Sequence, residues 1–281
     1  LERGAALLEG LGYRPKLMPN AAKRRHYLGG EDAERLADLV AAFEDPQVDA
    51  ILCARGGYGC ARLLPDFPMK AVRRNPKPFM GFSDITVLLN AFYEATGLVG
   101  FYGPMLTSNL IEEEQDFTLA EWLRAIGPQG AEVPYEVANR DAYGCFVPGT
   151  AEGTLRGGNL TLLAALCGTP WQPDFTGALV VIEDWKESYY SLDRQFTQLK
   201  QAGLLTGIAG LLLADFSQCG PEFDLPLADH LRWLTADLGV PVGYGFTIGH
   251  GSQTATIPIG VRGRLQAETG RLQVLESAFR P

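Results

Sequence analysis

Residues 78–92, PFMGFSDITVLLNAF, place a short apolar segment, a tight turn and a helix-forming segment in direct succession. The apolar part, Pro78–Phe82, is short enough for a buried parallel strand, and the helical pattern continues to about Thr96. Two similar apolar runs, Asp49–Ala54 and Leu98–Tyr102, lie on either side at helix-length separations. Short apolar strands that alternate with helices are typical of α/β proteins, so we predict a doubly wound parallel sheet here.

The residues before this pattern also alternate between helical and extended character. Apolar periodicity predicts helices over Leu1–Leu11 and Glu31–Glu44, with an extended segment at Tyr13–Pro19 between them. Folds of this type usually open with a strand, whereas this chain opens in a helix. We therefore expect either a truncated start or a preceding segment that lies outside this sequence.

A stretch rich in glycine and proline, Gly127–Pro148, interrupts the periodicity. We place a linker there, at 131–149, between an N-terminal domain at 1–130 and a C-terminal domain at 150–281. The second domain is predicted to be mixed α/β and rich in β structure. Its expected strands are Gly153–Arg156, Leu179–Glu183, Ile208–Ala214, Val242–Phe246, Thr254–Pro258, Val261–Leu265 and Leu272–Leu275, and its expected helices are Asn159–Leu166, Leu192–Ala202 and Leu227–Leu238.

The composition favours a globular protein that acts on a small molecule or a peptide. Of its 281 residues, 46% are apolar and 20% are charged, which excludes disorder and fibrous repeats. The 24 basic and 33 acidic residues give a net charge of −9 without a long basic block, which argues against nucleic-acid and anionic-membrane partners.

The location is expected to be cytoplasmic. Apolar runs such as Gly207–Ala214 are far shorter than the roughly 18 residues that a membrane span needs, and no signal peptide opens the chain. The five cysteines are an odd number without C-x-x-C spacing, so neither a disulfide framework nor a zinc cluster is indicated. A reducing compartment fits this pattern best.

Ser83 permits two interpretations. It lies at the turn between the strand and the helix, where a nucleophile elbow would present its hydroxyl at the carboxyl edge of the sheet. Serine is also a preferred helix N-cap, and Ile85 stands where the second glycine of G-x-S-x-G would be. From this segment alone the N-cap is the simpler interpretation.

A base and an orienting carboxylate are also available. Of the three histidines, His26 and His230 are interpreted as surface residues. His250 lies between two glycines after a strand-like run, and on its own an exposed loop histidine is the simpler interpretation. Glu183 ends an apolar run and could orient an imidazole, with Asp184 and Glu187 as rivals. Since side chains alternate along a strand, Glu183 and Asp184 should point oppositely, so that only one of them meets His250.

Two glycine segments can present backbone N–H groups to a ligand. They are Arg55–Gly59, which follows a predicted strand, and Gly157-Gly158-Asn159. Such groups suit a phosphate or a developing oxyanion, and a plain tight turn is the alternative. Neither nucleotide-loop motif, G-x-x-x-x-G-K-[ST] or G-x-G-x-x-G, can be read at the first segment. Gly57 and Ser83 share one predicted sheet edge, and Glu183 and His250 close loops of the second domain that can face this edge, so we expect a site between the domains.

Taken together, six separated motifs resemble the LD-carboxypeptidase family of serine peptidases, which also contains the microcin-immunity peptidases. The resemblance covers essentially the whole chain. The motifs are Arg55–Gly59, Asn75-Pro76-Lys77 with Gly81–Thr86, Tyr102–Met105, Gly157–Leu160, Ile182-Glu183-Asp184 with Asp193-Arg194, and Ile248–Gly251.

The resemblance implies a catalytic triad of Ser83, His250 and Glu183, with an oxyanion hole formed by the backbone N–H groups of Gly57 and Asp84. It also implies a flavodoxin-like N-terminal domain, a β-rich C-terminal domain and commonly a homodimer. Neither a metal nor a cofactor is needed. Family members of the murein-recycling type remove the terminal D-alanine from a cytoplasmic tetrapeptide.

The substrate remains open between alternatives. The resemblance also implies an opening strand before Leu1, which this sequence does not include. No long insertion of the microcin-immunity kind lies between Cys167–Pro170 and Glu183, and this second departure favours murein peptides. The alternatives are a microcin-immunity type peptidase or amidase and a catalytically silent peptide-binding protein. The candidates for substrate binding are Arg55, Arg156 and Asn159. A guanidinium group suits the free carboxylate that a carboxypeptidase must hold.

Overall fold

The computed structural model describes residues 1–111, 116–127 and 142–279. Its helices are α1 (Glu2–Gly10), α2 (Asp32–Glu44), α3 (Met69–Arg74), α4 (Thr86–Thr96), α5 (Asp116–Ile126), α6 (Leu160–Leu166), α7 (Tyr189–Gln201) and α8 (Leu227–Thr235), with 3₁₀ turns η1 (Cys60–Arg62), η2 (Leu64–Asp66) and η3 (Ser83–Ile85). Its strands are β1 (Ile51–Leu52), β2 (Phe79–Gly81), β3 (Gly100–Tyr102), β4 (Gly144–Val147), β5 (Thr150–Asn159), β6 (Ala178–Trp185), β7 (Gly210–Ser217), β8 (Val242–Tyr244), β9 (Ile257–Ile259), β10 (Arg262–Gln266) and β11 (Arg271–Val274).

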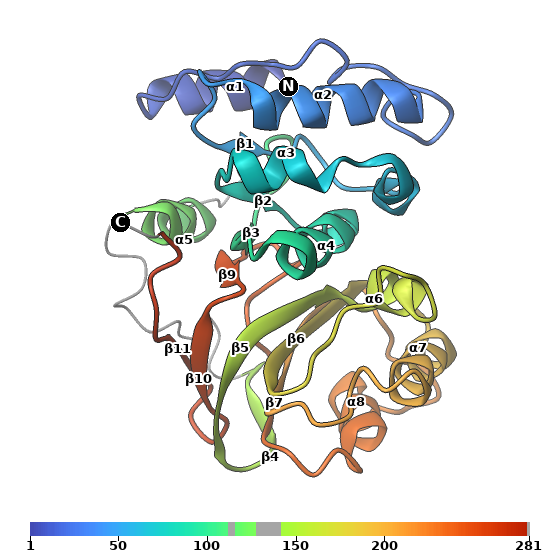
Figure 1. Ribbon diagram of the computed structural model, residues 1–281. Helices are drawn as coiled ribbons and strands as arrows, with labels where there is room; N and C mark the ends of the chain where they lie inside the picture. The colour runs from blue at the N-terminus through green and yellow to red at the C-terminus, as the bar shows by residue number, and fades with distance from the viewer. Residues whose placement is uncertain (112–115, 128–141, 280–281) are drawn as a thin grey trace.

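The N-terminal half contains a four-stranded sheet in the order β1-β2-β3-β9. The first three strands are parallel, as the alternation of apolar runs and helices predicts. Both β2 and β3 are buried throughout, which agrees with their continuous apolar sequence. Helices α1 to α4 are stacked around this sheet in the upper part of Figure 1. Residues 13–19, expected to be extended, form no strand, and Tyr13 and Leu17 are 43% and 47% exposed on the surface.

The C-terminal half contains a seven-stranded mixed sheet in the order β11-β10-β5-β6-β7-β8-β4. Strands β5 to β8 are parallel, while β4, β10 and β11 are antiparallel to their neighbours. Helices α6, α7 and α8 lie together beside this sheet (Figure 1). The prediction of an α/β fold with a parallel N-terminal sheet and a mixed, β-rich C-terminal part is confirmed.

Two features differ from the expected division of the chain. Part of the expected linker, 131–141, lies outside the described residues, but Gly144–Val147 form β4 and pair with β8. A four-residue edge strand among glycine and proline leaves little periodicity in the sequence, so the sequence pattern alone does not separate β4 from the linker. Strand β9, from the C-terminal half, joins the N-terminal sheet by pairing with β3.

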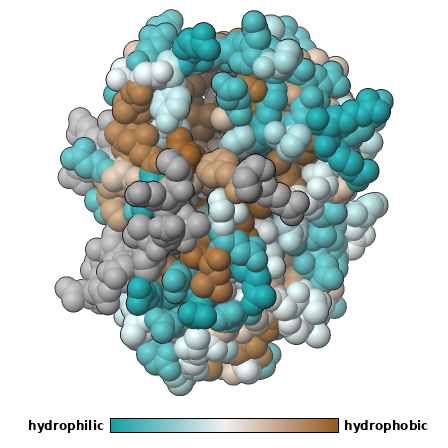
Figure 2. Space-filling model, turned by 60° about the vertical axis from the view of Figure 1, so that its left-hand side comes forward, coloured by the Kyte–Doolittle hydropathy of each residue, from teal (hydrophilic) through white to brown (hydrophobic). Residues whose placement is uncertain are grey.

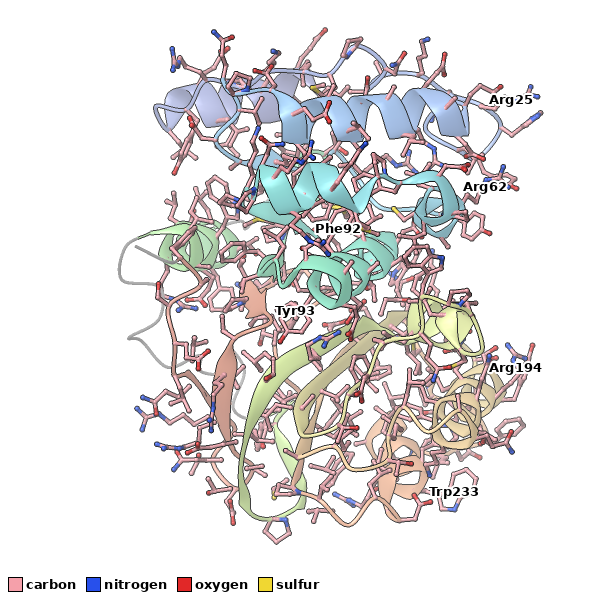
Figure 3. All side chains as sticks on the ribbon, in the orientation of Figure 1. Arg25, Arg62, Phe92, Tyr93, Arg194 and Trp233 are labelled. Atoms are coloured by element: carbon pink, nitrogen blue, oxygen red, sulfur yellow. The ribbon has the colours of Figure 1, made fainter. Side chains whose placement is uncertain are left out.

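One hydrophobic core cluster joins the two halves. It contains side chains from the N-terminal sheet and its helices, such as Phe79 and Phe92, and others from the C-terminal sheet, such as Leu155 and Leu265. Figure 3 shows Phe92 between α3 and α4, and Figure 2 shows apolar residues gathered in the middle of a face whose outer parts are mainly polar. Within the described residues, no helix is long and apolar enough to cross a membrane.

Candidate active site

Ser83 stands in a strained turn at the carboxyl end of β2. Its backbone φ is +61°, a left-handed conformation that is costly for a residue with a side chain. Its side chain makes no capping hydrogen bond, because η3 intervenes and the N-cap of α4 is Ile85. The N-cap interpretation of Ser83 is therefore wrong. The Ser83 hydroxyl instead lies 3.2 Å from Nε2 of His250.

The His250 ring bridges Ser83 and Glu183. Its Nδ1 lies 2.6 Å from Glu183 Oε2, and its side chain is 16% exposed. An Nδ1–H donated to the carboxylate leaves Nε2 as the acceptor for the Ser83 hydroxyl, which is the arrangement that a general base requires. Gly249 makes this close approach possible: its φ is +119°, and a Cβ there would lie 2.5 Å from Glu183 Oε2.

Glu183 is fully buried and accepts hydrogen bonds on both carboxylate oxygens. His250 donates to Oε2, while the Tyr102 hydroxyl, at 2.6 Å, and the Asn159 amide, at 3.1 Å, donate to Oε1. A buried carboxylate without such donors would carry a large desolvation cost. The three donors hold the carboxylate in the orientation that faces the imidazole.

The neighbouring side chains of Glu183 and Asp184 share one hydrogen-bond donor. The pairing of β6 with β7 shifts between Ile182 and Asp184, and both carboxylates accept hydrogen bonds from the Asn159 amide. Ile182 and Asp184 of β6 are two positions apart, whereas their partners Leu213 and Phe216 of β7 are three apart, so the extra residue of this β-bulge lies in β7. Of the two carboxylates, Glu183 is the one hydrogen-bonded to His250.

The surroundings raise the pKa of both His250 and Asp184. Burial disfavours the charged imidazole, but the hydrogen bond and charge of Glu183 outweigh it, with help from Asp184 and Asp215, and raise the pKa of His250 above 6.5. Burial and the neighbouring charge of Glu183 raise the pKa of Asp184 to about 6. The pKa of His250 is therefore raised by carboxylates from β6 and β7.

The glycine loop after β1 contacts the serine turn directly. A Cβ on Gly56 would lie 3.0 Å from the Ser83 Cβ and 3.2 Å from its Oγ, so a larger residue would crowd the hydroxyl. Gly57 follows with a φ of +116° and is exposed. The buried Asp84 carboxylate accepts the N–H of Cys60 at 2.8 Å, which ties this loop to the serine turn.

The three candidates for substrate binding occupy different settings. Arg55 is exposed, and its Nε donates to the Gly56 carbonyl at 3.4 Å. Asn159 is buried, caps α6 by accepting the Leu162 N–H, and donates to the two carboxylates of β6. Its side chain thus contributes to the site by binding the carboxylates of Glu183 and Asp184. Arg55 is the candidate whose charge remains exposed.

Arg156 does not fit its expected role. Its side chain is 4% exposed, forms an ion pair with Glu94 at 2.7 Å, and its guanidinium lies 4.2 Å from the centre of the Tyr93 ring. Figure 3 shows Tyr93 below α4, facing the C-terminal sheet. The β5 strand carries Arg156 into the contact between the two halves, so this cation is used in packing rather than offered to a substrate carboxylate.

The interpretation of His230 as a surface residue is wrong. The residue is 6% exposed, its Nε2 lies 3.1 Å from the Tyr189 carbonyl, and its ring stacks on that of Tyr189 at 4.3 Å. The amphipathic helix α8 turns this position inward between its polar neighbours. His26 is exposed, as expected.

Sequence reasoning missed three residues at the site. Trp185 stacks parallel to His250 at 5.8 Å and is 42% exposed, and Phe82 meets the same ring edge-on at 4.8 Å. Tyr102, which contacts Glu183, ends β3. The signal for Tyr102 was available, because the carboxyl ends of neighbouring parallel strands meet at one sheet edge.

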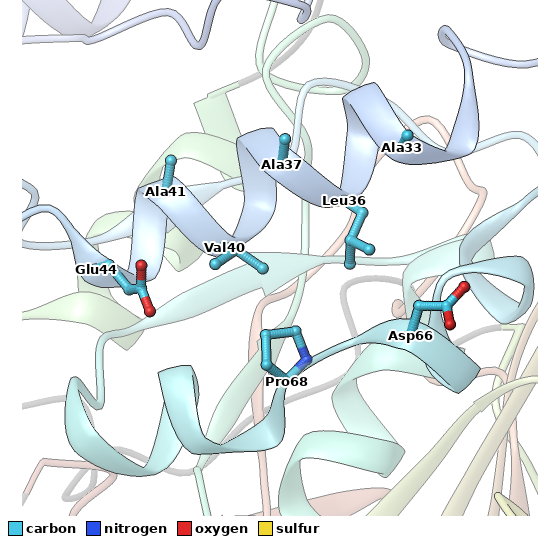
Figure 4. A pocket seen from close by; sticks show the side chains of 8 residues that line it. All are labelled: Ala33, Leu36, Ala37, Val40, Ala41, Glu44, Asp66 and Pro68. Atoms are coloured by element: carbon cyan, nitrogen blue, oxygen red, sulfur yellow. The ribbon is translucent and has the colours of Figure 1, made fainter.

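Another depression in the surface lies away from these residues. It follows one side of α2, between Leu36, Val40 and Glu44 and the facing Asp66 and Pro68 (Figure 4). None of Ser83, His250 and Glu183 lines it. Within the described parts of the chain, no group of three or more His, Cys, Asp or Glu side chains could hold a metal ion.

Comparison with known proteins identifies the family. Family models described as the LD-carboxypeptidase N-terminal domain and the LD-carboxypeptidase C-terminal domain match residues 1–103 and 152–265. A probable murein peptide carboxypeptidase of Bacillus subtilis is 41% identical, over 93% of this chain and 82% of that protein. The chain belongs to the LD-carboxypeptidase family. The resemblance drawn from the six motifs is confirmed, and so is the class of enzyme it implies, a serine-type LD-carboxypeptidase.

Other members of the LD-carboxypeptidase family agree with this assignment. The murein tetrapeptide carboxypeptidase of Pseudomonas aeruginosa is 34% identical, over 92% of this chain and 86% of that protein. The crystal structure of muramoyltetrapeptide carboxypeptidase from Oxalobacter formigenes matches with a TM-score of 0.86 at 31% identity, covering 96% of this chain and 91% of that one. An MccF-like protein from Bacillus anthracis matches with a TM-score of 0.87 at 26% identity, covering 98% and 90% of the two chains.

Proposed function

We propose that this protein removes the terminal D-alanine from murein tetrapeptides by cleaving an L,D peptide bond, with Ser83 as nucleophile, His250 as general base and Glu183 as the orienting acid. The observation that carries the proposal is the continuous chain of contacts from Ser83 Oγ to His250 Nε2, at 3.2 Å, and from His250 Nδ1 to Glu183 Oε2, at 2.6 Å. The names of the related carboxypeptidases support the substrate class.

The first half of the reaction forms an acyl-enzyme. Ser83 Oγ attacks the carbonyl carbon before the terminal D-alanine while His250 Nε2 takes the hydroxyl proton. The negative charge that develops on the carbonyl oxygen is stabilised by the N–H groups of Gly57 and Asp84. These are the residues directly after Gly56 and Ser83, which lie close to each other. His250 then gives its proton to the amine of D-alanine, and the C–N bond breaks.

The second half releases the shortened peptide. A water molecule attacks the ester carbon, His250 takes one of its protons, and the ester C–O bond breaks as Ser83 recovers its proton. The Glu183 carboxylate stabilises the imidazolium that forms in each half. The fully buried position of Glu183 strengthens this stabilisation because water screens the pair little.

Arg55 is the cation that we assign to the substrate's free carboxylate. It belongs to the glycine loop, one residue before Gly56, which touches the Ser83 side chain. Its side chain is exposed, and a guanidinium group can bind a carboxylate through two parallel hydrogen bonds. An Arg55→Ala variant should therefore show a raised KM for tetrapeptide, whereas Arg25→Ala, another exposed arginine, should not.

The function is tested by incubating the protein with a murein tetrapeptide and following the loss of one alanine residue by mass spectrometry. A tetrapeptide that ends in L-alanine is the stereochemical control. Ser83→Ala should release no alanine, and Ser191→Ala, which alters a buried serine on α7, should behave as wild type. An unchanged D-tetrapeptide together with labelling of Ser83 by a fluorophosphonate would refute the murein substrate while retaining the triad.

We also propose a cytoplasmic location and a homodimer. The five cysteines are all free, which supports a reducing compartment, and the family resemblance supports the dimer. Cell fractionation tests the first proposal. Light scattering coupled to gel filtration tests the second, because it distinguishes the mass of one chain from that of two.

A further inference from the structure

Tyr102 lies between the nucleophile and the orienting acid. It ends β3, its side chain is 1% exposed, and its hydroxyl donates to Glu183 Oε1 at 2.6 Å. The same hydroxyl oxygen accepts the backbone N–H of Ser83 at 3.1 Å. One phenol therefore joins the serine turn of the N-terminal sheet to the carboxylate of the C-terminal sheet.

In these two contacts a neutral phenol acts once as a hydrogen-bond donor and once as an acceptor. Its single hydrogen is committed to Glu183, and one of its oxygen lone pairs receives the Ser83 N–H. Burial, followed by the charge of Glu183, raises the pKa of Tyr102 well above its usual value of 10. The phenol consequently remains protonated, and remains a donor, at any pH at which the enzyme works.

We propose that Tyr102 is a positioning residue that acts in two directions: it holds the strained backbone of Ser83, and it limits the negative charge that Glu183 presents to His250. The inference rests on the triad proposed above. The first action follows from the φ of +61° at Ser83, since a left-handed non-glycine residue persists only where its surroundings hold it. The second follows because a donor on Oε1 draws electron density away from Oε2.

The charges that face His250 set the expected direction of the effect. Glu183 and Asp184 from β6 and Asp215 from β7 all favour the protonated ring. Removing the Tyr102 hydroxyl leaves Glu183 with one donor fewer on Oε1, where Asn159 remains at 3.1 Å. The carboxylate then attracts the proton on His250 more strongly, so more of the base is in its charged, inactive form at neutral pH.

The test uses Tyr102→Phe, which retains the ring and its packing, with Tyr143→Phe as the matched control. Tyr143 also donates its hydroxyl hydrogen, but to the Ala267 carbonyl. The first measurement is the rate at which a fluorophosphonate labels Ser83. We expect labelling of Tyr102→Phe to be about 10- to 100-fold slower, the range typical of partners that orient a reactive group, and the control to match wild type.

The second measurement is an NMR titration of the imidazole signals. The chain has three histidines, and His250→Ala assigns the relevant signal. We expect the titration midpoint of His250 to rise by about half a unit or more in Tyr102→Phe and to stay constant in the control. A purely structural role for Tyr102 would slow labelling and leave this midpoint unchanged.

Two results would overturn the proposal: labelling of Tyr102→Phe at the wild-type rate, or slow labelling with an unchanged His250 midpoint. Both measurements are independent of the peptide substrate. A wild-type protein that is labelled at Ser83 but releases no D-alanine would therefore remove the proposed function without deciding the role of Tyr102.

Discussion

The exchange of Glu183 for glutamine tests the site most sharply, because the structure determines how the amide must sit. Three donors point at the carboxylate: His250 on Oε2, and Tyr102 and Asn159 on Oε1. A glutamine has one oxygen and one NH₂ group to offer them. If the oxygen faces Tyr102 and Asn159, two hydrogen bonds survive and the NH₂ group faces His250.

That orientation disables the base. An NH₂ group facing Nδ1 requires Nδ1 to be an acceptor, so the ring hydrogen moves to Nε2, which can then no longer take the Ser83 proton. The opposite orientation sets the NH₂ group against two donors, and leaving such buried groups unpaired costs about 1–3 kcal/mol each. We therefore expect kcat to fall by about 10⁴-fold, as for the equivalent change in serine proteases, with little change in KM.

Asp184→Asn is the matched control. The Asp184 carboxylate accepts hydrogen bonds from Asn159, from Thr161 and from the Trp185 N–H, so its exchange should lower the free energy of unfolding by about 1–3 kcal/mol. It leaves the contact between Glu183 and His250 in place. Steady-state hydrolysis of the tetrapeptide compares the two variants. A larger loss of kcat in Asp184→Asn than in Glu183→Gln would refute the assignment of Glu183 as the orienting acid.

Three further predictions follow from the geometry. Ser83→Ala should abolish hydrolysis but change the free energy of unfolding, measured by urea titration, by no more than about 1 kcal/mol, since it loses a single hydrogen bond; substantial turnover would disprove the nucleophile. The value of kcat/KM should rise with pH through a midpoint above 6.5, because His250 must be neutral and its pKa is raised; a pH–rate profile that falls over this range would contradict the base. Gly56→Ala should slow fluorophosphonate labelling at least about 10-fold with folding intact by circular dichroism, because its Cβ would lie 3.0 Å from the Ser83 Cβ; wild-type labelling would contradict a tight fit.

Much of the fold could be predicted from periodicity, because buried strands leave continuous apolar runs. The strand-turn-helix at 78–92 is observed as β2, η3 and α4. Local sequence patterns did not predict the features that depend on contacts between distant residues. Strand β4 is short and lies among glycine and proline, and β9 leaves the C-terminal half to pair with β3. Neither feature has a pattern that a short stretch of sequence would reveal.

In the candidate site, too, some features could be predicted from local sequence and others depend on contacts between distant residues. Individual residues at strand ends could be nominated from the sequence, but the choice between helix cap and nucleophile at Ser83 depended on His250, 167 residues away. The bulge in β7 opposite Glu183 depends on the register between β6 and β7, which the pattern of either strand alone does not reveal. The ion pair that occupies the Arg156 guanidinium depends on Glu94, 62 positions earlier, and no local sequence pattern indicates this partner.

The pairing of β9 with β3 has a consequence for the time at which the enzyme becomes active during synthesis. The chain leaves the ribosome from its N-terminus, so Ser83 and Glu183 emerge well before His250 and before the strand that follows it. Ile257 of β9 pairs with Tyr102 of β3, so the first sheet is completed only after His250, the proposed base, has been synthesised. On the proposed triad, a nascent chain that already contains Ser83 would therefore remain unable to hydrolyse peptides until His250 and β9 have also emerged.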